Sequence, residues 1–196
     1  MQKIVVFCGS SLGFDPIYKE SAIQLGNEFV KRGITLIYGG AKIGLMGVLA
    51  ETILSQGGNV IGVIPGLLKK EEVVNEDVTE LIVTKTMSER KVIMSKLCDG
   101  YISLAGGFGT LDEFFEGLTM SQLHIEQKPN GILNLNGYFD FLLKQVDHMI
   151  GEGFVRPNNK ELLIVSNSVS ELLDKMESYQ APQKSHVINK VVKNDH

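Results

Sequence analysis

The feature that most constrains the fold is an alternation of short apolar runs with longer amphipathic stretches. The runs are rich in Val, Ile and Leu, and continuous apolarity is typical of strands that helices cover on both faces. Seven runs qualify as strands: Lys3–Cys8, Thr35–Tyr38, Asn59–Ile64, Thr79–Thr84, Gly100–Leu104, Gly131–Asn134 and Glu161–Val165. We therefore expect an α/β, Rossmann-like three-layer sandwich around a central parallel sheet of about seven strands.

Length and composition favour one globular domain. A chain of 196 residues with 43% hydrophobic and 21% charged residues can bury a core without cross-links. We find no internal repeat and no composition shift that would mark a second domain. We expect a single domain over residues 1–179, followed by a polar C-terminal tail over residues 180–196. That tail is either docked as a terminal helix or frayed, and we favour the frayed form.

Charge and cysteine usage narrow the partners. The net charge of -4 and pI near 5.6 leave no general cationic field, so we expect neither nucleic acid nor a membrane as partner. The apolar run Ile4–Phe7 is too short for a signal-peptide core or a membrane span, which favours a cytoplasmic protein. Cys8 and Cys98 are expected to be inert core thiols. The histidines show no ligand spacing, so no metal site is predicted.

Three glycine-bearing turns follow predicted strands, at Cys8–Ser11, Tyr38–Gly40 and Ala105–Thr110. In a parallel sheet, all three lie at the carboxyl ends of the strands. Helix N-termini there present free amides and a partial positive charge. Their convergence predicts a phosphorylated ligand, with Gly106, Gly107, Gly109 and Thr110 as the phosphate loop.

The glycine spacing matches neither the dinucleotide fingerprint nor the Walker motif, in which a lysine would have to come later than Lys42 does. A mononucleotide is therefore favoured over NAD or ATP. Glycines at such turns also serve tight turns and close packing. We keep that interpretation for Gly44 and Gly47.

Two charged helix starts flank the strand Gly100–Leu104. Arg90 belongs to the helix before this strand and Glu113 to the helix after it, so both are expected near the ligand edge. The alternative for Glu113 is structural, because Thr110 and Glu113 have the spacing of a capping box. The same spacing recurs at two other predicted helix starts, namely Thr86 with Glu89 and Ser168 with Glu171. Local sequence alone favours capping over catalysis for Glu113.

A family resemblance changes this weighting. The strings Ser88–Lys91, Asp99–Leu104 and Gly106–Glu113 closely resemble the LOG (lonely guy) cytokinin-activating phosphoribohydrolases, which were once labelled lysine decarboxylases. The resemblance extends over roughly residues 3 to 178 and includes shorter matches elsewhere: Phe7–Ser10, Tyr38–Gly40, Gly44–Gly47, Ser121–Leu123, Lys128–Pro129 and Leu133–Asn134. Ala105, Met120 and His124 depart from the residues common in that family, and these departures bear on the base pocket and the subunit interface.

The resemblance implies hydrolysis of the N-glycosidic bond of an N6-modified adenosine 5′-monophosphate, with Arg90 and Glu113 as catalytic residues. It also implies a homodimer or a higher homo-oligomer, with sites near the subunit interface. The residues on which ligand contacts would fall are Glu72, Lys91, Gly107, Phe108, Gly109, Thr110, Leu111, Asp112 and Thr119. We expect Glu113 to stabilise positive charge on the ribose while Arg90 positions phosphate or ribose oxygens. No metal and no organic cofactor is required for this chemistry.

Two other functions remain open. A non-catalytic carrier of a nucleotide or a phosphorylated cofactor would use the same loops without cleaving its ligand. Such a carrier has little need for Arg90 together with Glu113. A decarboxylase using pyridoxal phosphate needs a Schiff-base lysine with an acidic partner for the pyridine nitrogen. No such constellation is evident, and Lys91 fits better as a phosphate neighbour or a solvated surface lysine.

Overall fold

The computed structural model describes residues 1–69 and 73–182. Its centre is a sheet of seven strands in the order β4-β3-β2-β1-β5-β6-β7, and every neighbouring pair is parallel. The strands are β1 (Lys3–Phe7), β2 (Thr35–Tyr38), β3 (Val60–Pro65), β4 (Glu80–Thr84), β5 (Gly100–Ser103), β6 (Asn130–Leu133) and β7 (Leu163–Ser166). The predicted parallel sheet is confirmed.

The strand ends differ slightly from the predicted ones. Most shift by a single residue, but the last strand was placed too early. Glu161 and Leu162 belong to the 3-10 helix η2 (Pro157–Leu162), and β7 begins at Leu163. Pro157 opens that turn, because a proline costs nothing at the first position of a helix.

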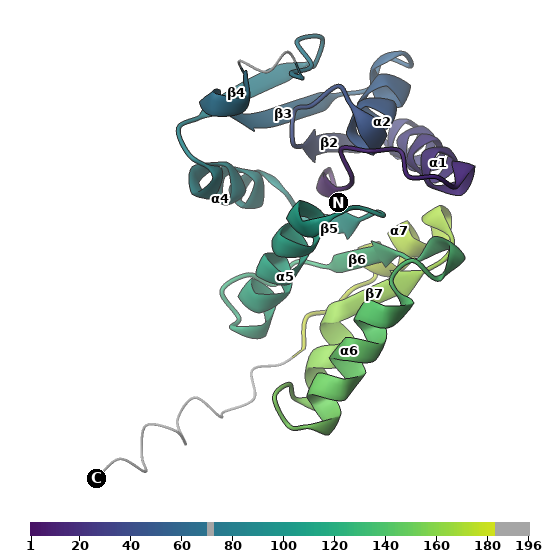
Figure 1. Cartoon of the computed structure of the whole chain (residues 1–196), viewed down its shortest axis with the longest axis vertical. Helices are drawn as coiled ribbons and strands as arrows, with labels where there is room; N and C mark the ends of the chain where they lie inside the picture. Colours follow the sequence, from purple (N-terminus) through teal and green to yellow (C-terminus); the bar gives the residue numbers. More distant parts are fainter. Residues whose placement is uncertain (70–72, 183–196) are drawn as a thin grey trace.

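Helices cover both faces of the sheet and complete the three-layer sandwich (Figure 1). They are α1 (Pro16–Arg32), α2 (Gly44–Leu54), the short α3 (Gly66–Lys69), α4 (Met87–Leu97), α5 (Phe108–Gln122), α6 (Asp140–Gly151) and α7 (Val169–Glu177), with a 3-10 turn η1 (Leu135–Gly137) before α6. Core packing places α1, α2 and α7 on one face. On the other face, α4 packs against the first half of the sheet and α5 and α6 against the second half.

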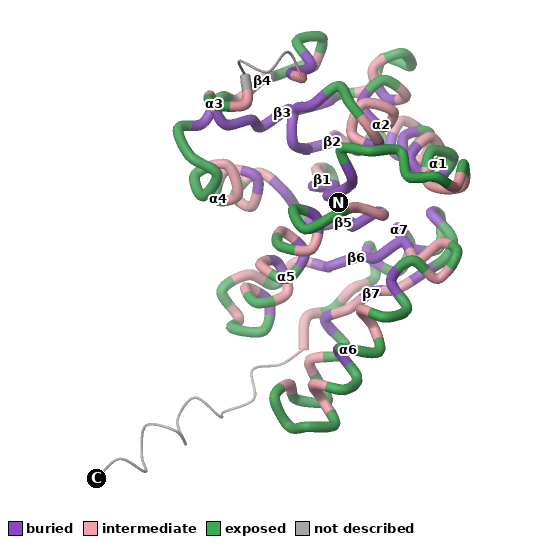
Figure 2. The backbone as a smooth tube through the Cα atoms, in the orientation of Figure 1, coloured by how far each residue is buried: buried purple, intermediate pink, exposed green. Residues whose placement is uncertain are grey.

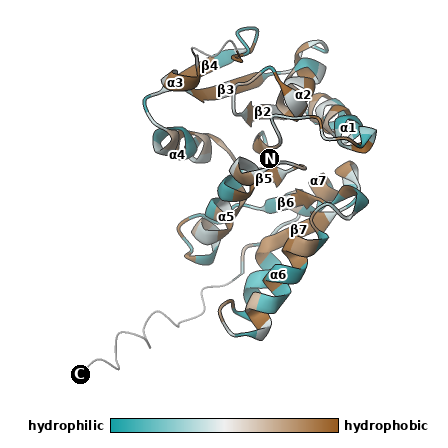
Figure 3. Cartoon of the chain, in the orientation of Figure 1, coloured by the Kyte–Doolittle hydropathy of each residue, from teal (hydrophilic) through white to brown (hydrophobic). Residues whose placement is uncertain are grey.

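Successive side chains of β1 point to opposite faces of the sheet and pack into the cores on both sides. Ile4 and Val6 belong to the core under α1, α2 and α7, whereas Val5 and Phe7 belong to the core under α4. All four are buried, and Figure 2 shows the central strands as buried stretches between exposed loops. Figure 3 shows the same contrast in hydropathy, with apolar strands and a two-sided α6. No helix in the described part of the chain is long and apolar enough to span a membrane.

The sheet reverses its direction of growth at β1. Strands β2, β3 and β4 are added on one side of β1, and β5, β6 and β7 on the other. The chain crosses from one half to the other through α4, which contacts β1, β2, β3 and β4. Such a reversal leaves a crevice at the carboxyl ends of the two central strands, which is where open α/β sheets bind ligands. A ligand site is therefore expected at the carboxyl ends of β1 and β5.

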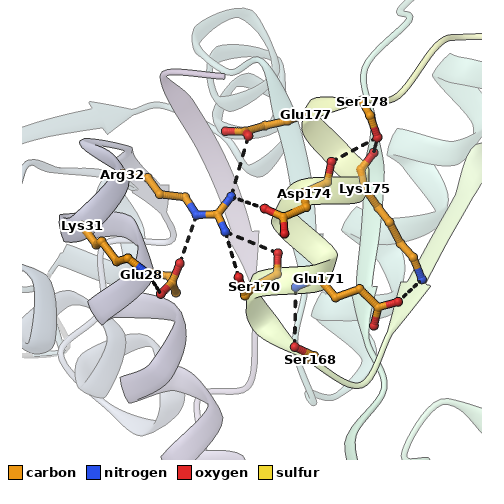
Figure 4. A network of polar contacts seen from close by, with 10 residues as sticks. All are labelled: Glu28, Lys31, Arg32, Ser168, Ser170, Glu171, Asp174, Lys175, Glu177 and Ser178. Carbon is orange, nitrogen blue, oxygen red and sulfur yellow. Dashed lines mark hydrogen bonds and ion pairs between the residues drawn. The ribbon is translucent and has the colours of Figure 1, made fainter.

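A polar network links α1 to α7, the first and last helices of one layer (Figure 4). Nε of Arg32 donates to Glu28 at 3.0 Å within α1, and Nη1 donates to Asp174 at 2.7 Å on α7. The same guanidinium donates to the hydroxyl of Ser170 at 3.0 Å and lies 3.7 Å from the carboxylate of Glu177. The side chains of Arg32 and Glu28 are 18% and 19% exposed, whereas the α7 carboxylates of Asp174 and Glu177 are 64% and 46% exposed. The network connects the N-terminal and C-terminal parts of the domain.

Several local predictions have clear outcomes. The capping box at the start of α4 is confirmed in its first half, since Thr86 Oγ1 accepts from the amide of Glu89 at 3.0 Å. Ser168 caps α7 in the same way at 3.5 Å. The capping box predicted at Thr110 is wrong, because α5 begins at Phe108 and its N-cap is Gly107. From residue 183 onward, the predicted tail lies outside the described residues.

Candidate active site

A cavity of about 270 Å³ lies at the carboxyl ends of the central strands. It is bordered by Gly9 and Ser10 after β1, by Gly39 after β2, and by Gly107–Thr110 after β5. The three glycine turns singled out in the sequence therefore meet around one space, which we call the glycine-loop cavity. Their meeting follows from the parallel sheet, since all three strands point to the same edge.

Arg90 enters this cavity from the first turn of α4. The cap at Thr86 fixes the start of that helix, and the amide of Lys85 donates to Glu89 at 2.7 Å. A Cβ at Gly39 would lie 2.7 Å from Nη2 of Arg90. Gly39 thus leaves the space in which the guanidinium sits.

Glu113 borders the same cavity from the second turn of α5. Its Oε1 lies 3.0 Å from Nη2 of Arg90, and each side chain is only 11% exposed. Nε of Arg90 is buried and has no hydrogen-bond partner within residues 1–69 and 73–182. The ion pair therefore leaves one donor of the guanidinium buried without a partner among these residues.

The environment of Glu113 changes its acidity. Burial raises the pKa of the Glu113 carboxyl above its ordinary value, and the charge of Arg90 opposes part of that rise. Asp112 and Glu116 on the same helix raise the pKa further, while Lys91 lowers it. A carboxyl with a raised pKa is better suited to exchange protons near neutral pH than an exposed one.

The start of α5 offers backbone donors to the cavity. Its N-cap, Gly107, has no side-chain capping bond, and helix geometry leaves the amides of the first turn without partners inside the helix. A Cβ added at Gly107 or Gly109 would meet nothing within 4 Å in the described part of the chain, so the side-chain direction is open at both positions. Amides of this kind, with the helix dipole behind them, favour an anion such as a phosphate.

Gly106 and Thr110 shape this loop from within. Thr110 is buried, and a Cβ at Gly106 would lie 2.1 Å from its Oγ1. The carbonyl of Gly106 accepts a hydrogen bond of 2.5 Å from the hydroxyl of Tyr138. Close packing therefore holds the loop on one side while its amides remain available on the other.

A second, more enclosed pocket of about 160 Å³ lies between α4 and α5, and we call it the α4–α5 pocket. Phe7 and Glu113 line both this pocket and the glycine-loop cavity. Lys91 lines it as well, where its Nζ lies 2.5 Å from Glu116 and 3.1 Å from Asp112. Those ion pairs raise the pKa of Lys91, the pair with Glu116 most of all.

The predicted site residues are only partly brought together. The glycine-loop cavity is lined by seven of them: Arg90, Gly107, Phe108, Gly109, Thr110, Asp112 and Glu113. Leu111 instead packs against the core beneath α5. Thr119 lines neither the cavity nor the α4–α5 pocket, and its hydroxyl donates to the carbonyl of Phe115. Glu72 lies outside the described residues.

Some residues of the cavity were not predicted as site residues from the sequence. Met46 and Met87 line it, and Met46 also lies beside the position of Gly39. Phe7 contributes from the end of β1. Nothing in their local sequence distinguishes them from core residues, and only the position of Phe7 at a strand end could have suggested a role.

Cys8 and Cys98 are buried free thiols, as predicted, and burial raises the pKa of both. The packing role of Gly44 and Gly47 is confirmed, since a Cβ at either would lie within 2.5 Å of backbone atoms.

The fold and the site together define a Rossmann-like α/β protein in which three strand-end glycine loops and a buried Arg–Glu pair enclose one cavity. Residues 46–176 match the family model described as "Possible lysine decarboxylase". A cytokinin riboside 5′-monophosphate phosphoribohydrolase of Arabidopsis thaliana is 43% identical over 189 residues, covering 96% of this chain and 88% of the relative. A second Arabidopsis thaliana protein of the same name is 41% identical over 191 residues, covering 97% of this chain and 88% of the relative. The chain belongs to this family, the LOG phosphoribohydrolases.

The fold has wider relatives. The molybdenum cofactor binding protein of Rippkaea orientalis superimposes with a TM-score of 0.68 at 24% sequence identity, covering 91% of this chain and 97% of that one. At this identity the likeness concerns the fold alone.

Proposed function

We propose that the protein hydrolyses the N-glycosidic bond of an adenosine 5′-monophosphate, plain or N6-modified, and releases the free base and ribose 5-phosphate. The observation that carries this proposal is the buried pair of Arg90 and Glu113, which borders the same cavity as the glycine loops. The amides at the start of α5 suit a phosphate, and Glu113 presents a carboxylate to the same cavity. A nucleoside 5′-monophosphate carries the phosphate and the ribose that these two features would meet.

In this reaction the bond between C1′ and the base nitrogen breaks, and its electron pair leaves with the base. Positive charge then builds on the ribose, and the ionised carboxylate of Glu113 stabilises that charge more strongly in the transition state than in the ground state. Water adds to C1′ and loses a proton, which Glu113 accepts. That proton passes from Glu113, directly or through solvent water, to the departing base nitrogen, which regenerates the carboxylate, so atoms and charges balance without a metal or an organic cofactor.

Arg90 serves the reaction in two ways. Its positive charge keeps the pKa of Glu113 lower than burial alone would set it, and this favours the ionised form that the ribose needs. Its guanidinium lines the glycine-loop cavity, and we assign it to a ribose or phosphate oxygen. The amides of Gly107–Thr110 hold the phosphate.

We assign this activity to residues 1–179 as one domain, acting as a homodimer or a higher homo-oligomer in the cytoplasm. Exposed apolar side chains on or beside α4 and α5 support self-association: Val92, Phe108, Phe115, Leu123 and Ile125. The two buried free thiols fit a reducing compartment. A carrier without catalysis is the alternative, but it would gain nothing from burying Arg90 against Glu113.

The test is incubation with AMP, N6-isopentenyl-AMP and the two matching nucleosides, followed by chromatography for free base. Release of base from the monophosphates but not from the nucleosides is expected, because only the monophosphates engage the phosphate loop. Binding of the monophosphates without release of base would overturn the proposal in favour of a carrier. Equal turnover of nucleosides would overturn the role of the glycine loop.

A further inference from the structure

The α4–α5 pocket adjoins the reacting centre of the proposed function. It shares Glu113 and Phe7 with the glycine-loop cavity. Its volume of about 160 Å³ is well below the roughly 300 Å³ from which whole-ligand sites begin. The pocket therefore suits an appendage of a ligand whose main body occupies the neighbouring cavity.

Most of the pocket wall is hydrocarbon. Phe7, Val92, Met94 and Met120 line it, and Gly117 leaves room on α5. Burying a short hydrocarbon group in such a wall is favourable, since it removes apolar surface from water. Methionine side chains also adapt to irregular shapes.

One part of the wall is polar. The hydroxyl of Ser95 donates to Oε1 of Glu126, and the hydroxyl of Tyr101 donates to Oε2 at 2.6 Å. Nζ of Lys128 lies 3.2 Å from the same Oε2 and donates to the carbonyl of Ser95 at 2.5 Å. Ser95, Tyr101 and Glu126 line the pocket, and we call these three the polar wall.

The polar wall offers acceptors and few donors. The hydroxyl protons of Ser95 and Tyr101 are already committed to Glu126, while hydroxyl and carboxylate oxygens keep further lone pairs. Burial alone would raise the pKa of Glu126, but the bonds from Ser95 and Tyr101 and the charge of Lys128 outweigh it and lower that pKa. Glu126 is therefore ionised at neutral pH and remains an acceptor.

We propose that the α4–α5 pocket takes the N6 substituent of the base, and that Ser95, Tyr101 and Glu126 favour a substituent carrying a hydroxyl over the same hydrocarbon without one. This inference rests on the proposed function, because it places the ribose at Glu113. A hydroxyl on the substituent donates to the polar wall, whereas a plain hydrocarbon contacts only the apolar part. The polar wall is satisfied by its own bonds, so an unsubstituted base costs it nothing.

The experiment measures kcat/KM for AMP, N6-isopentenyl-AMP and the side-chain-hydroxylated form of the latter. The wild-type protein is expected to prefer the hydroxylated substrate over the isopentenyl one by about tenfold or more, the usual worth of a hydrogen bond to a charged acceptor. Ser95→Ala and Glu126→Gln are each expected to bring this ratio close to one. A ratio taken on one preparation is independent of the folded fraction, so partial misfolding does not disguise the result.

Two further variants sharpen the test. Met120→Phe narrows the pocket and is expected to lower kcat/KM for both substituted substrates relative to AMP by about tenfold or more. Ser178→Ala is the matched control for Ser95→Ala, because its hydroxyl bonds to the backbone of α7 and lines neither cavity. It is expected to keep the wild-type ratio.

The outcomes separate the two levels of the argument. A wild-type ratio at or below one, or a ratio unchanged in Ser95→Ala and Glu126→Gln, overturns the role of the polar wall while base release from AMP still supports the proposed function. Insensitivity of the substituted substrates to Met120→Phe places the substituent elsewhere. Failure of the wild-type protein to release base from any monophosphate overturns the proposed function itself.

Discussion

Nη2 of Arg90 lies 3.0 Å from Oε1 of Glu113. The two side chains come from α4 and α5, the helices that precede and follow β5 along the chain. An ion pair at this depth is costly to break, because the remaining partner keeps a buried charge without compensation. The pair is therefore held in place by the fold while it borders the cavity.

Replacing the carboxylate tests its chemical role. Glu113→Gln is expected to reduce base release by about a hundredfold or more, because the amide carries no negative charge and cannot accept the proton of water. Nucleotide binding is expected to persist, since the amides of the glycine loop are unchanged. Steady-state kinetics and calorimetric titration with AMP measure the two properties. Glu177→Gln, on α7 and away from both cavities, is the control, and turnover by Glu113→Gln at the wild-type rate would refute the assignment.

The acidity of Glu113 predicts the pH dependence. Activity needs the ionised form, and burial raises the pKa of Glu113, so the acid limb of kcat/KM is expected at a pH above the ordinary glutamate value of about 4.3. Arg90→Met removes the charge that opposes this rise, so it is expected to move the limb to still higher pH and to lower the maximum. The measurement is kcat/KM across the acid range. If kcat/KM of the wild-type protein fell only near the ordinary glutamate pKa, the role of Glu113 would be contradicted. If the pH at which kcat/KM falls were the same in Arg90→Met, the effect of Arg90 on the pKa of Glu113 would be contradicted.

Gly39 provides a test of positioning. Its substitution by alanine places a Cβ 2.7 Å from Nη2 of Arg90 and 3.0 Å from Sδ of Met46. Both atoms belong to flexible side chains that can move, so the unfolding free energy is expected to change by less than about 1 kcal/mol. Displacing the guanidinium is expected to lower kcat/KM by about tenfold or more. Urea unfolding and steady-state kinetics measure both. Gly151→Ala meets nothing within 4 Å and is the control.

The network between α1 and α7 affects stability rather than activity. Arg32→Ala removes the bonds to Glu28, Asp174 and Ser170 and is expected to lower the unfolding free energy by about 1 to 2 kcal/mol. Lys31→Ala is the matched control, since Lys31 is 72% exposed and its one ion pair among the described residues is with Glu28. Urea unfolding separates the two variants. Equal stability of both would show that the network contributes nothing measurable, and unchanged kcat/KM in Arg32→Ala is expected throughout.

The sheet could be predicted because its strands are buried on both faces, and burial leaves a direct trace in apolar runs. The limits of that signal are visible at Glu161 and Leu162. Leu162 adjoins the apolar run of β7, yet it and Glu161 close the turn that Pro157 opens. An apolar run cannot distinguish a strand from a short turn packed on the core.

The candidate site was partly predictable for a similar reason. Glycine turns after parallel strands meet by topology, so the sequence indicated their convergence. The role of Thr110 was not predictable from spacing, because spacing does not say which residue begins the helix. Its hydroxyl packs beneath Gly106 instead of capping α5. The contact between Gly39 and Arg90 depends on how α4 crosses the sheet, and no local pattern encodes it.

Because the sheet grows in opposite directions from β1, the active site is complete only after both halves of the sheet have formed. Arg90 belongs to the crossover that leaves the first four strands, and Glu113 follows β5, which must pair with β1 before its helix can dock. A chain in which only the N-terminal half has assembled holds a guanidinium without its carboxylate. Ligand binding and turnover therefore require both halves of the sheet, and neither half forms a complete active site by itself.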